Sequence, residues 1–157
     1  MTGLWQRLRS GLTGLVTRPP ALQVAALCLR KGPSGLEVLL VRSLDTGRWI
    51  IPKGWPMPGR TLAQAAATEA WEEAGVEGDV DPDACATYGY QKRQRGGLRW
   101  TCQVQVFRLR VARLADSFPE AGRRERKWFA AAKAAKKVSE PELRAYLAGL
   151  TAEALPD

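Results

Sequence analysis

Residues 54–76 read GWPMPGRTLAQAAATEAWEEAGV, and this stretch sets what we expect of the whole chain. Its first seven letters are rich in glycine and proline, which predicts a loop. The alanine-rich residues that follow predict a helix from about Thr61 to Ala74. Gly75 comes directly after that helix, and a glycine there can end it in the left-handed conformation. The stretch is therefore expected to fold as a loop followed by a helix.

Three glutamates stand on this predicted helix at positions i, i+3 and i+4. Glu69, Glu72 and Glu73 then project from one side within about one turn. Like charges this close repel one another, whereas Mg²⁺ would bind them through hard oxygen ligands. The alternative is an ordinary solvated acidic face. The packing face of the helix is expected to hold Ala63, Ala67, Ala70 and Ala74 together with Trp71.

Strands are predicted on both sides of this helix. The segments concerned are rich in apolar residues and are bounded by glycine, proline and other turn formers. We expect strands at residues 22–29, 37–41, 49–51, 86–92 and 100–113, and a last helix at 140–150. Strands, then a helix, then strands again indicate a mixed α/β domain. Because the chain shows no internal repeat, residues 21–157 are expected to form a single domain.

Composition narrows the chemistry that the chain can perform. Its 157 residues are 45% hydrophobic and 25% charged, as in globular proteins. The absence of histidine excludes a Ser-His-Asp triad and a histidine-ligated zinc site. The net charge of +8 favours anionic partners. Residues 61–91 hold seven acids and no base, whereas residues 92–113 hold seven bases and no acid. Neighbouring acidic and basic regions suit a metal-assisted attack on a polyphosphate.

Residues 1–20 and the cysteines bear on partners and compartment. Leucines at helical spacing and three arginines predict an amphipathic segment over residues 1–20. It either docks onto the domain or a partner subunit, as in a homodimer, or binds a membrane surface, or forms a disordered tail. No apolar run is long enough to span a bilayer. Cys28, Cys85 and Cys102 form no C-x-x-C pair, so we expect a cytoplasmic protein without disulfides.

Residues 54–76 resemble the signature motif of the Nudix hydrolases. That motif reads Gly, five residues, Glu, seven residues, Arg-Glu, an aliphatic residue, any residue, Glu-Glu, any residue, Gly and an aliphatic residue. The matching residues are Gly54, Glu69, Glu72, Glu73, Gly75 and Val76, with Ala70 at the first aliphatic position. Arg60 replaces the first glutamate of the motif, and Thr68 replaces an arginine that orients the family's glutamates through a salt bridge. These two departures favour, as an alternative, a non-catalytic module that binds a phosphorylated ligand.

The resemblance extends beyond the motif. Residues 48–54, 88–92 and 122–129 are similar to the diphosphoinositol polyphosphate phosphohydrolase branch, which also acts on dinucleoside polyphosphates. The resemblance implies a Nudix-type α/β/α sandwich with a mixed β-sheet. It also implies cleavage of a phosphoanhydride in a phosphorylated small molecule with Mg²⁺ or Mn²⁺. The high positive charge keeps RNA binding, or pyrophosphate removal from RNA 5′ ends, as an alternative, although the chain has no RNA-recognition motif of its own.

The resemblance also implies roles for individual acids. Glu69, Glu72 and Glu73 would bind the metal, together with the carbonyl of Gly54. Because the chain has no histidine, its general base must be a carboxylate. The catalytic candidates are therefore Glu73, Glu69 and the downstream acid Glu125. Glu120 lies in the same segment as Glu125, and a surface charge is the alternative role for both of these downstream acids.

Cations and aromatic residues near the motif are the candidates for substrate binding, because arginine can engage phosphate oxygens in bidentate fashion. The candidate cations are Arg42, Arg48, Lys53, Lys92, Arg93, Arg95 and Arg99. Arg48 and Lys53 flank the motif directly, and for each of the others the alternative is a solvated surface charge. Trp49 and Trp55 either stack on a base or belong to the core.

Overall fold

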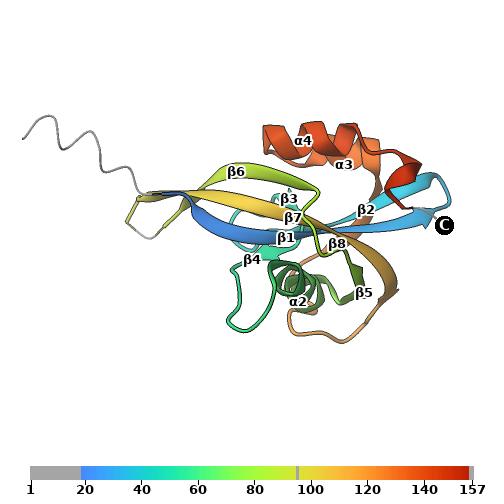
Figure 1. Cartoon of the computed structure of the whole chain (residues 1–157), viewed down its shortest axis with the longest axis horizontal. Coiled ribbons are helices and arrows are strands. Elements are labelled where there is room, and N and C mark those ends of the chain that lie inside the picture. The colour runs from blue at the N-terminus through green and yellow to red at the C-terminus, as the bar shows by residue number, and fades with distance from the viewer. Residues whose placement is uncertain (1–18, 95, 156–157) are drawn as a thin grey trace, which may run out of the picture.

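The computed structural model describes residues 19–94 and 96–155 (Figure 1). Within those residues it contains an eight-stranded sheet, three α-helices and one short 3₁₀ helix. The strands are β1 (Ala21–Gly32), β2 (Gly35–Arg42), β3 (Trp49–Ile50), β4 (Lys53–Gly54), β5 (Val76–Val80), β6 (Ala86–Arg93), β7 (Arg99–Leu114) and β8 (Arg126–Ala130). The helices are α2 (Leu62–Ala74), α3 (Ala131–Lys137) and α4 (Pro141–Ala148), followed by the 3₁₀ helix Ala152–Ala154.

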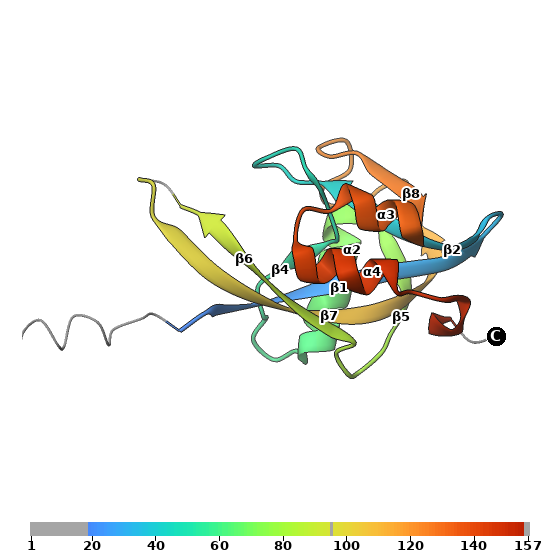
Figure 2. The same cartoon turned by 90° about the horizontal axis from the view of Figure 1, so that it is seen from above.

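The sheet is mixed and lies between two layers of helix. Its main path runs β3-β2-β1-β7-β5, with β4 beside β1, β6 beside β7 and β8 beside β2. β1 and β7 run parallel, and the other pairs are antiparallel. α2 covers one face of the sheet, whereas α3 and α4 cover the other (Figures 1 and 2). The predicted α/β/α sandwich with a mixed sheet is confirmed.

β1 shows how the sheet buries both of its faces. Successive side chains of a strand point to opposite faces. Residues 24, 26 and 28 therefore join the core beneath α2, whereas residues 25, 27 and 29 join the core beneath α3 and α4. A central strand covered on both sides reads as a continuous apolar run, as this one does. Cys28 and Cys102 are buried in this sheet, and Cys85 is partly buried.

α2 begins and ends as the sequence predicts. Thr61 is its N-cap, since the Thr61 hydroxyl accepts a hydrogen bond of 3.1 Å from the backbone N–H of Gln64. In return the Gln64 side chain accepts one of 2.9 Å from the Thr61 N–H, which completes a capping box. Gly75 ends the helix with a φ of 67°, in the left-handed region that favours glycine.

The packing face of α2 differs in part from the prediction. Ala67 and Trp71 are only partly buried. The buried residues are Ala63, Ala65, Ala66, Ala70, Glu73 and Ala74. Ala66, Ala70 and Glu73 follow one another at helical spacing, so they share one stripe of the helix. The helix is thus rotated relative to the expected orientation, and this rotation turns Glu73 inward.

β4, β5, β8, α3 and the 3₁₀ helix fall outside the elements that the sequence predicts. β4 is only two residues long and lies where a loop was expected. β5 is short, and its acidic residues Glu77 and Asp79 alternate with glycine, so it lacks an apolar signal. β8 follows an arginine-rich loop and pairs with β2, which lies far away in the sequence. α3 is only seven residues long, which is too short for a helical period to stand out. The last helix was expected at 140–150 and spans Pro141–Ala148.

The amphipathic segment predicted for residues 1–20 lies almost entirely outside the described residues, so it stays a prediction. The same holds for the expectation that residues 21–157 form a single domain. In the described part of the chain, no helix is long and apolar enough to cross a membrane.

Candidate active site

β4 places Gly54 directly against α2. In its pairing with β1, Lys53 lies opposite Ala25 and Gly54 lies opposite Val24. A Cβ atom on Gly54 would lie 2.2 Å from the carboxyl carbon of Glu69. That separation is far inside van der Waals contact, so only glycine leaves room for this carboxylate against the β4 backbone.

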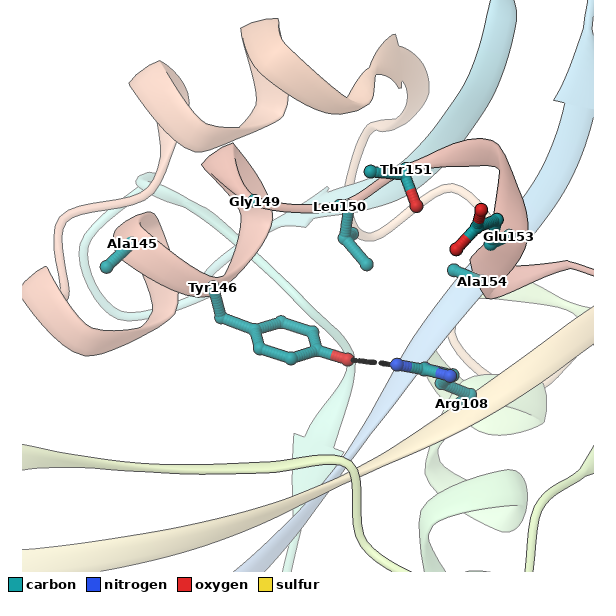
Figure 3. Close-up of a pocket in the computed structure, with 8 residues that line it drawn as sticks. All are labelled: Arg108, Ala145, Tyr146, Gly149, Leu150, Thr151, Glu153 and Ala154. Carbon is teal, nitrogen blue, oxygen red and sulfur yellow. Dashed lines mark hydrogen bonds between the residues drawn. The ribbon is translucent and has the colours of Figure 1, made fainter.

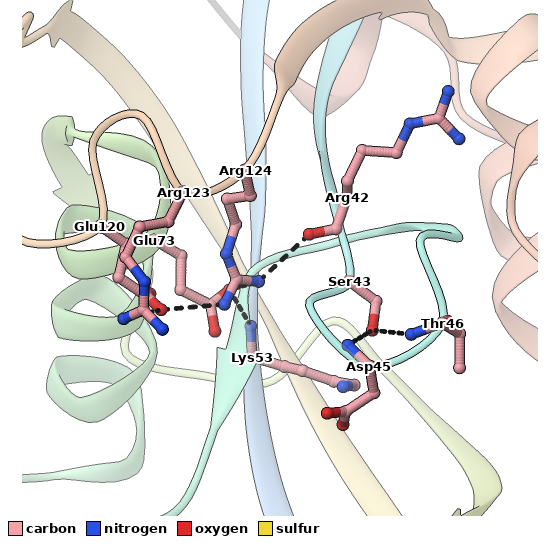
Figure 4. Close-up of polar contacts among 9 residues, drawn as sticks. All are labelled: Arg42, Ser43, Asp45, Thr46, Lys53, Glu73, Glu120, Arg123 and Arg124. Carbon is pink, nitrogen blue, oxygen red and sulfur yellow. Dashed lines mark hydrogen bonds and ion pairs between the residues drawn. The ribbon is translucent and has the colours of Figure 1, made fainter.

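Glu73 is buried between β4 and the loop that precedes β8. The backbone N–H of Lys53 donates to its Oε2 over 3.3 Å. Nη1 of Arg124 lies 3.6 Å from the same oxygen (Figure 4). The side chains of Glu73 and Arg124 are only 9% and 7% exposed. The buried carboxylate thus has both a hydrogen bond and an ion pair, which offset the loss of its hydration.

The loop between β7 and β8 brings a fourth carboxylate, Glu120, to this place. The Glu120 N–H donates to the carbonyl of Glu72 over 3.0 Å. Its carboxylate accepts a hydrogen bond of 3.0 Å from Nη2 of Arg124. Of the two downstream acids considered from the sequence, Glu120 is therefore the one that joins the motif glutamates.

The structure does not bring Glu125 to the motif glutamates. The Glu125 carbonyl accepts a hydrogen bond of 3.0 Å from the backbone N–H of Arg42, which holds it beside β2. Its carboxylate is 60% exposed and lies 3.6 Å from Nε of Arg42. Among the described residues, none of its contacts is with a motif glutamate. Four residues of the loop separate it from Glu120, and the turn of that loop sends the two acids to different places.

Burial and mutual repulsion raise the pKa of two motif glutamates. Burial, and then the nearby Glu72 and Glu120, raise the pKa of Glu69 from its ordinary 4.5 to about 7. Burial is also the main cause for Glu73, whose pKa rises to about 7 although Arg124 and Lys53 oppose the rise. Both carboxyl groups therefore titrate near neutral pH in the metal-free protein, which is common among groups in catalytic sites.

The four carboxylates fit a divalent cation by their chemistry. Hard oxygen donors are the ligands that Mg²⁺ and Mn²⁺ prefer. A cation would relieve the repulsion that raises the pKa of Glu69. Within residues 19–94 and 96–155, no three acidic side chains stand close enough to enclose an ion as they are. Binding would therefore require a flexible side chain, such as that of Glu69, to move closer to the other carboxylates.

The raised pKa values predict how stability depends on pH. The folded pKa of Glu73, about 7, lies above its unfolded value of 4.5, so folding takes up a proton between these values. Protonation of Glu73 contributes fully to the free energy of unfolding below pH 4.5, and this contribution is lost as the pH rises through 7. For the buried Glu73 it amounts to about 3 kcal/mol. Urea unfolding with EDTA at pH 5 and pH 8 measures this difference.

The control for this pH experiment is the double variant Glu69→Gln/Glu73→Gln. It cannot titrate at these positions, so we expect its free energy of unfolding at pH 8 to exceed that of the wild type. Mg²⁺ should narrow the gap by stabilising only the wild type. Identical pH profiles for the two proteins in EDTA would contradict the burial of these charges.

A basic cleft of about 270 Å³ opens beside β4. Its charged lining residues are Asp45, Arg48, Lys53, Lys92, Arg93 and Glu140. Nζ of Lys53 lies 4.9 Å from the centre of the Tyr90 ring. Burial, and to a smaller extent the nearby Lys92, lower the pKa of Lys53 although Glu73 opposes this shift. An anion in the cleft would stabilise the charged form of this lysine.

The structure separates the predicted phosphate-binding cations. Arg48, Lys53 and Lys92 line the cleft. Arg42 does not line it, because its guanidinium stacks 4.1 Å from the centre of the Trp49 ring and donates to the carbonyl of Gly47. Figure 4 shows the Arg42 side chain pointing away from Glu73. Arg95 lies outside the described residues, so its role stays a prediction.

The two tryptophans beside the motif have different environments. Trp49 is 8% exposed and packs edge-to-face on Phe129, with ring centres 5.1 Å apart. It belongs to the core, which leaves no face for a base. Trp55 is 41% exposed, and Nζ of Lys92 lies 5.1 Å from its ring centre. Of the two, only Trp55 offers an accessible ring next to the cleft.

The match to a known family covers most of the chain. A family model described as the NUDIX domain matches residues 20–150. The chain belongs to the Nudix family. That match includes the motif helix α2, the cleft beside β4 and the loop that carries Glu120.

Relatives in Arabidopsis thaliana are also Nudix proteins. Nudix hydrolase 12, mitochondrial, of Arabidopsis thaliana is 32% identical over 100 residues, which are 59% of this chain and 47% of that protein. Nudix hydrolase 13, mitochondrial, of the same organism is 31% identical over 98 residues. The chain spans about half the length of these curated relatives.

Solved Nudix structures share the fold. An Ap4A hydrolase of C. elegans in a binary complex aligns with a TM-score of 0.61 and 24% identity, over 81% of this chain and 92% of that one. The NUDIX domain of Shewanella oneidensis NrtR, complexed with ADP ribose, aligns with a TM-score of 0.60 and 18% identity, over 89% of this chain and 93% of that one. At these identities the likeness shows the fold.

The two departures from the Nudix motif contact each other. Nη1 of Arg60 donates to Oγ1 of Thr68 over 2.6 Å. The same hydroxyl donates to the carbonyl of Gln64, one turn earlier on α2, over 3.0 Å. Arg60 and Thr68 are therefore linked to each other, and the Thr68 hydroxyl is occupied by bonds that involve no motif glutamate.

A second cleft, of about 400 Å³, lies between β7 and the end of α4 (Figure 3). Arg108 projects into it from β7 and donates to the Tyr146 hydroxyl, with its Nη2 at 2.8 Å. Glu153 is the one carboxylate among its lining residues. This cleft lacks the clustered acids of the Nudix motif, so the candidate active site is the one at α2 and β4.

Reasoning from the sequence missed Arg124 as a site residue. It lies in the arginine-rich run before Trp128, where its sequence neighbours Arg123 and Glu125 are exposed. The only available signal was the likeness of residues 122–129 to the family branch named above. Its position against Glu73 depends on how the loop folds back onto α2, which no local pattern encodes.

Proposed function

We propose that this Nudix domain hydrolyses a phosphoanhydride bond of a dinucleoside polyphosphate or a diphosphoinositol polyphosphate, with Mg²⁺ or Mn²⁺ as cofactor. The observation that carries the proposal is the position of Lys53. Its backbone N–H binds Glu73, whereas its side chain lines the basic cleft. A polyphosphate held in the cleft would therefore lie next to the carboxylates that suit a metal ion.

The chemistry follows from these residues. When bound, the metal ion would polarise the diphosphate and offset its negative charge. Glu73, with a pKa near 7, is suited to accept a proton from the attacking water. A new P–O bond forms to the water oxygen while the bridging P–O bond breaks, which leaves two phosphorylated products. Lys53, Lys92 and Arg48 would hold the phosphate oxygens during this exchange.

Three observations support this substrate class. The residues flanking the motif resemble the branch that acts on these compounds. One solved structure with the same fold is an Ap4A hydrolase. The exposed ring of Trp55, close to Lys92, offers a surface on which a nucleobase could stack. We also propose a reducing compartment such as the cytoplasm, because the three cysteines of the sequence form no C-x-x-C pair.

A substrate panel tests the proposal. Diadenosine tetraphosphate, a diphosphoinositol polyphosphate, ADP-ribose and a 5′-triphosphorylated RNA are incubated separately with the protein and Mg²⁺, and products are followed by ³¹P NMR. We expect turnover of at least one of the first two and no turnover in EDTA. A failure to hydrolyse either of them under any metal condition would refute the proposal.

The same panel distinguishes the alternatives. Arg60 and Thr68, which depart from the motif, favour a non-catalytic module, and that module would show thermal stabilisation by these compounds without products. The charge of +8 favours RNA, and in that case the triphosphorylated RNA would be processed in preference to the small molecules. RNA binding through phosphates would weaken steeply with added salt.

A further inference from the structure

Arg124 is a buried cation placed between two carboxylates that come from different elements. Its Nη1 lies 3.6 Å from Oε2 of Glu73, on α2, and its Nη2 donates over 3.0 Å to Oε1 of Glu120, in the β7–β8 loop. Its Nη1 also reaches the carbonyl of Arg42 on β2, at 3.4 Å. Figure 4 shows the guanidinium between these groups. One rigid, planar group therefore spans a helix, a loop and a strand.

The loop that carries Arg124 is attached to the end of α2. The Ala115 N–H donates to the carbonyl of Gly75 over 2.8 Å, and the Glu120 N–H donates to that of Glu72. Nη1 of Arg126 bonds the carbonyls of Ala74 and Ala115, at 2.6 and 2.8 Å. These bonds close both ends of the loop onto the last turn of the helix. The loop backbone that carries Arg124 is therefore held next to the helix turn that carries Glu72 and Glu73.

No comparable support for the glutamates comes from position 68. The Thr68 hydroxyl is engaged with Gln64 and Arg60, and it is too short to bridge two carboxylates. Arg60 is directed to Thr68 and not to an acid. The ion pair that holds Glu73 is instead formed by Arg124, which lies in the β7–β8 loop, far from Glu73 in the sequence.

We propose that Arg124 is the positioning residue of the carboxylate cluster: it fixes Glu73 relative to Glu120, so that both are in place before a metal ion binds. This inference rests on the function proposed above. A guanidinium suits the task because its fork bonds two acceptors at once in a fixed plane. A lysine would bring the same charge as a single point and could not hold both carboxylates in one geometry.

The test compares Arg124→Ala and Arg124→Lys with Arg123→Ala as the matched control. Arg123 is the preceding residue, has the same charge, is 63% exposed and lies 3.8 Å from Glu120. The first readout is Mn²⁺ binding to the free protein, measured by electron paramagnetic resonance without substrate. The second is kcat and KM on the substrate that the panel identifies. The third is thermal unfolding in EDTA.

We expect Arg124→Ala to weaken Mn²⁺ binding about ten-fold and to lower kcat by about 30-fold, with little change in KM. Arg124→Lys should show a smaller loss of both, and Arg123→Ala should match the wild type within about two-fold. Adding Arg60→Glu and Thr68→Arg to Arg124→Ala should recover part of the Mn²⁺ affinity. In that triple variant the side chain at position 68 can reach Glu72, one turn later on α2.

Two results would overturn the inference. The first is Mn²⁺ binding by Arg124→Ala that equals or exceeds that of the wild type together with unchanged kcat, because Arg124 would then only neutralise charge. The second is an Arg124→Lys variant whose Mn²⁺ affinity and kcat equal those of the wild type. If the alanine variant does not fold, the lysine variant alone decides the question. If the wild type binds Mn²⁺ but hydrolyses nothing, the proposed function fails while the metal-binding readout still tests Arg124.

Discussion

Glu73→Gln is expected to lower kcat by about 10³-fold on any substrate that the panel identifies, while the protein stays folded. The substitution removes one anionic oxygen from the carboxylate cluster and the group best suited to accept the proton of water. Glutamine has nearly the same shape, so the space between β4 and Arg124 stays filled. Steady-state kinetics at saturating Mg²⁺, together with circular dichroism, measure both parts of this expectation.

Glu77→Gln is the matched control for this variant. Glu77 lies on β5, four residues after Glu73, and its carboxylate is 42% exposed. It pairs with Arg113 of β7, at 2.5 Å, and takes no part in the cluster. We expect its kcat to equal that of the wild type. A Glu73→Gln protein that keeps more than about a tenth of the wild-type kcat would exclude Glu73 as ligand and base, given the usual size of such effects.

Gly54→Ala is expected to lower kcat by about 100-fold with little loss of stability. The new methyl group would lie 2.2 Å from the carboxyl carbon of Glu69, so this carboxylate must rotate away from β4. The displaced atoms are the end of a flexible side chain, and they can move at small cost in folding energy. Kinetics at saturating Mg²⁺ and thermal unfolding measure the two effects separately.

Gly149→Ala is the control for this glycine. Gly149 has a φ of −89°, and the nearest atom to an added Cβ would be 3.7 Å away, which is ordinary contact. It follows α4, remote from the carboxylates, and its replacement should leave kcat unchanged. Wild-type kcat in Gly54→Ala would show that the position of the Glu69 carboxylate against β4 does not matter for the reaction.

Local sequence patterns were sufficient to predict the helix and strands at the centre of the fold. The capping residue Thr61 and the terminating Gly75 act within one turn of helix, so both ends of α2 could be predicted. β1 could be predicted because a central strand is covered on both faces, and its sequence is therefore a continuous apolar run. The strands from Ala86 and from Arg99 were also predicted, because each is an apolar-rich segment bounded by turn formers.

The elements that escaped prediction depend on distant partners. β8 exists as a strand because β2 lies beside it, and β5 because β7 offers an edge. The orientation of α2 was misjudged as well, since a helix made largely of alanine has no strong apolar face. Small side chains allow several rotations, and the shape of the sheet beneath selects the one that buries Ala65, Ala66 and Glu73.

The family and the acidic helix follow from the sequence alone, because they depend on spacing along one continuous segment. Which groups come to lie beside the motif glutamates depends on the tertiary structure. It selected Glu120 over Glu125, moved Arg42 away from the cleft and brought Arg124 to Glu73. The physical reason is that these contacts join α2 to a loop some 50 residues later, and the path of that loop depends on bonds to the end of α2 that no local pattern records.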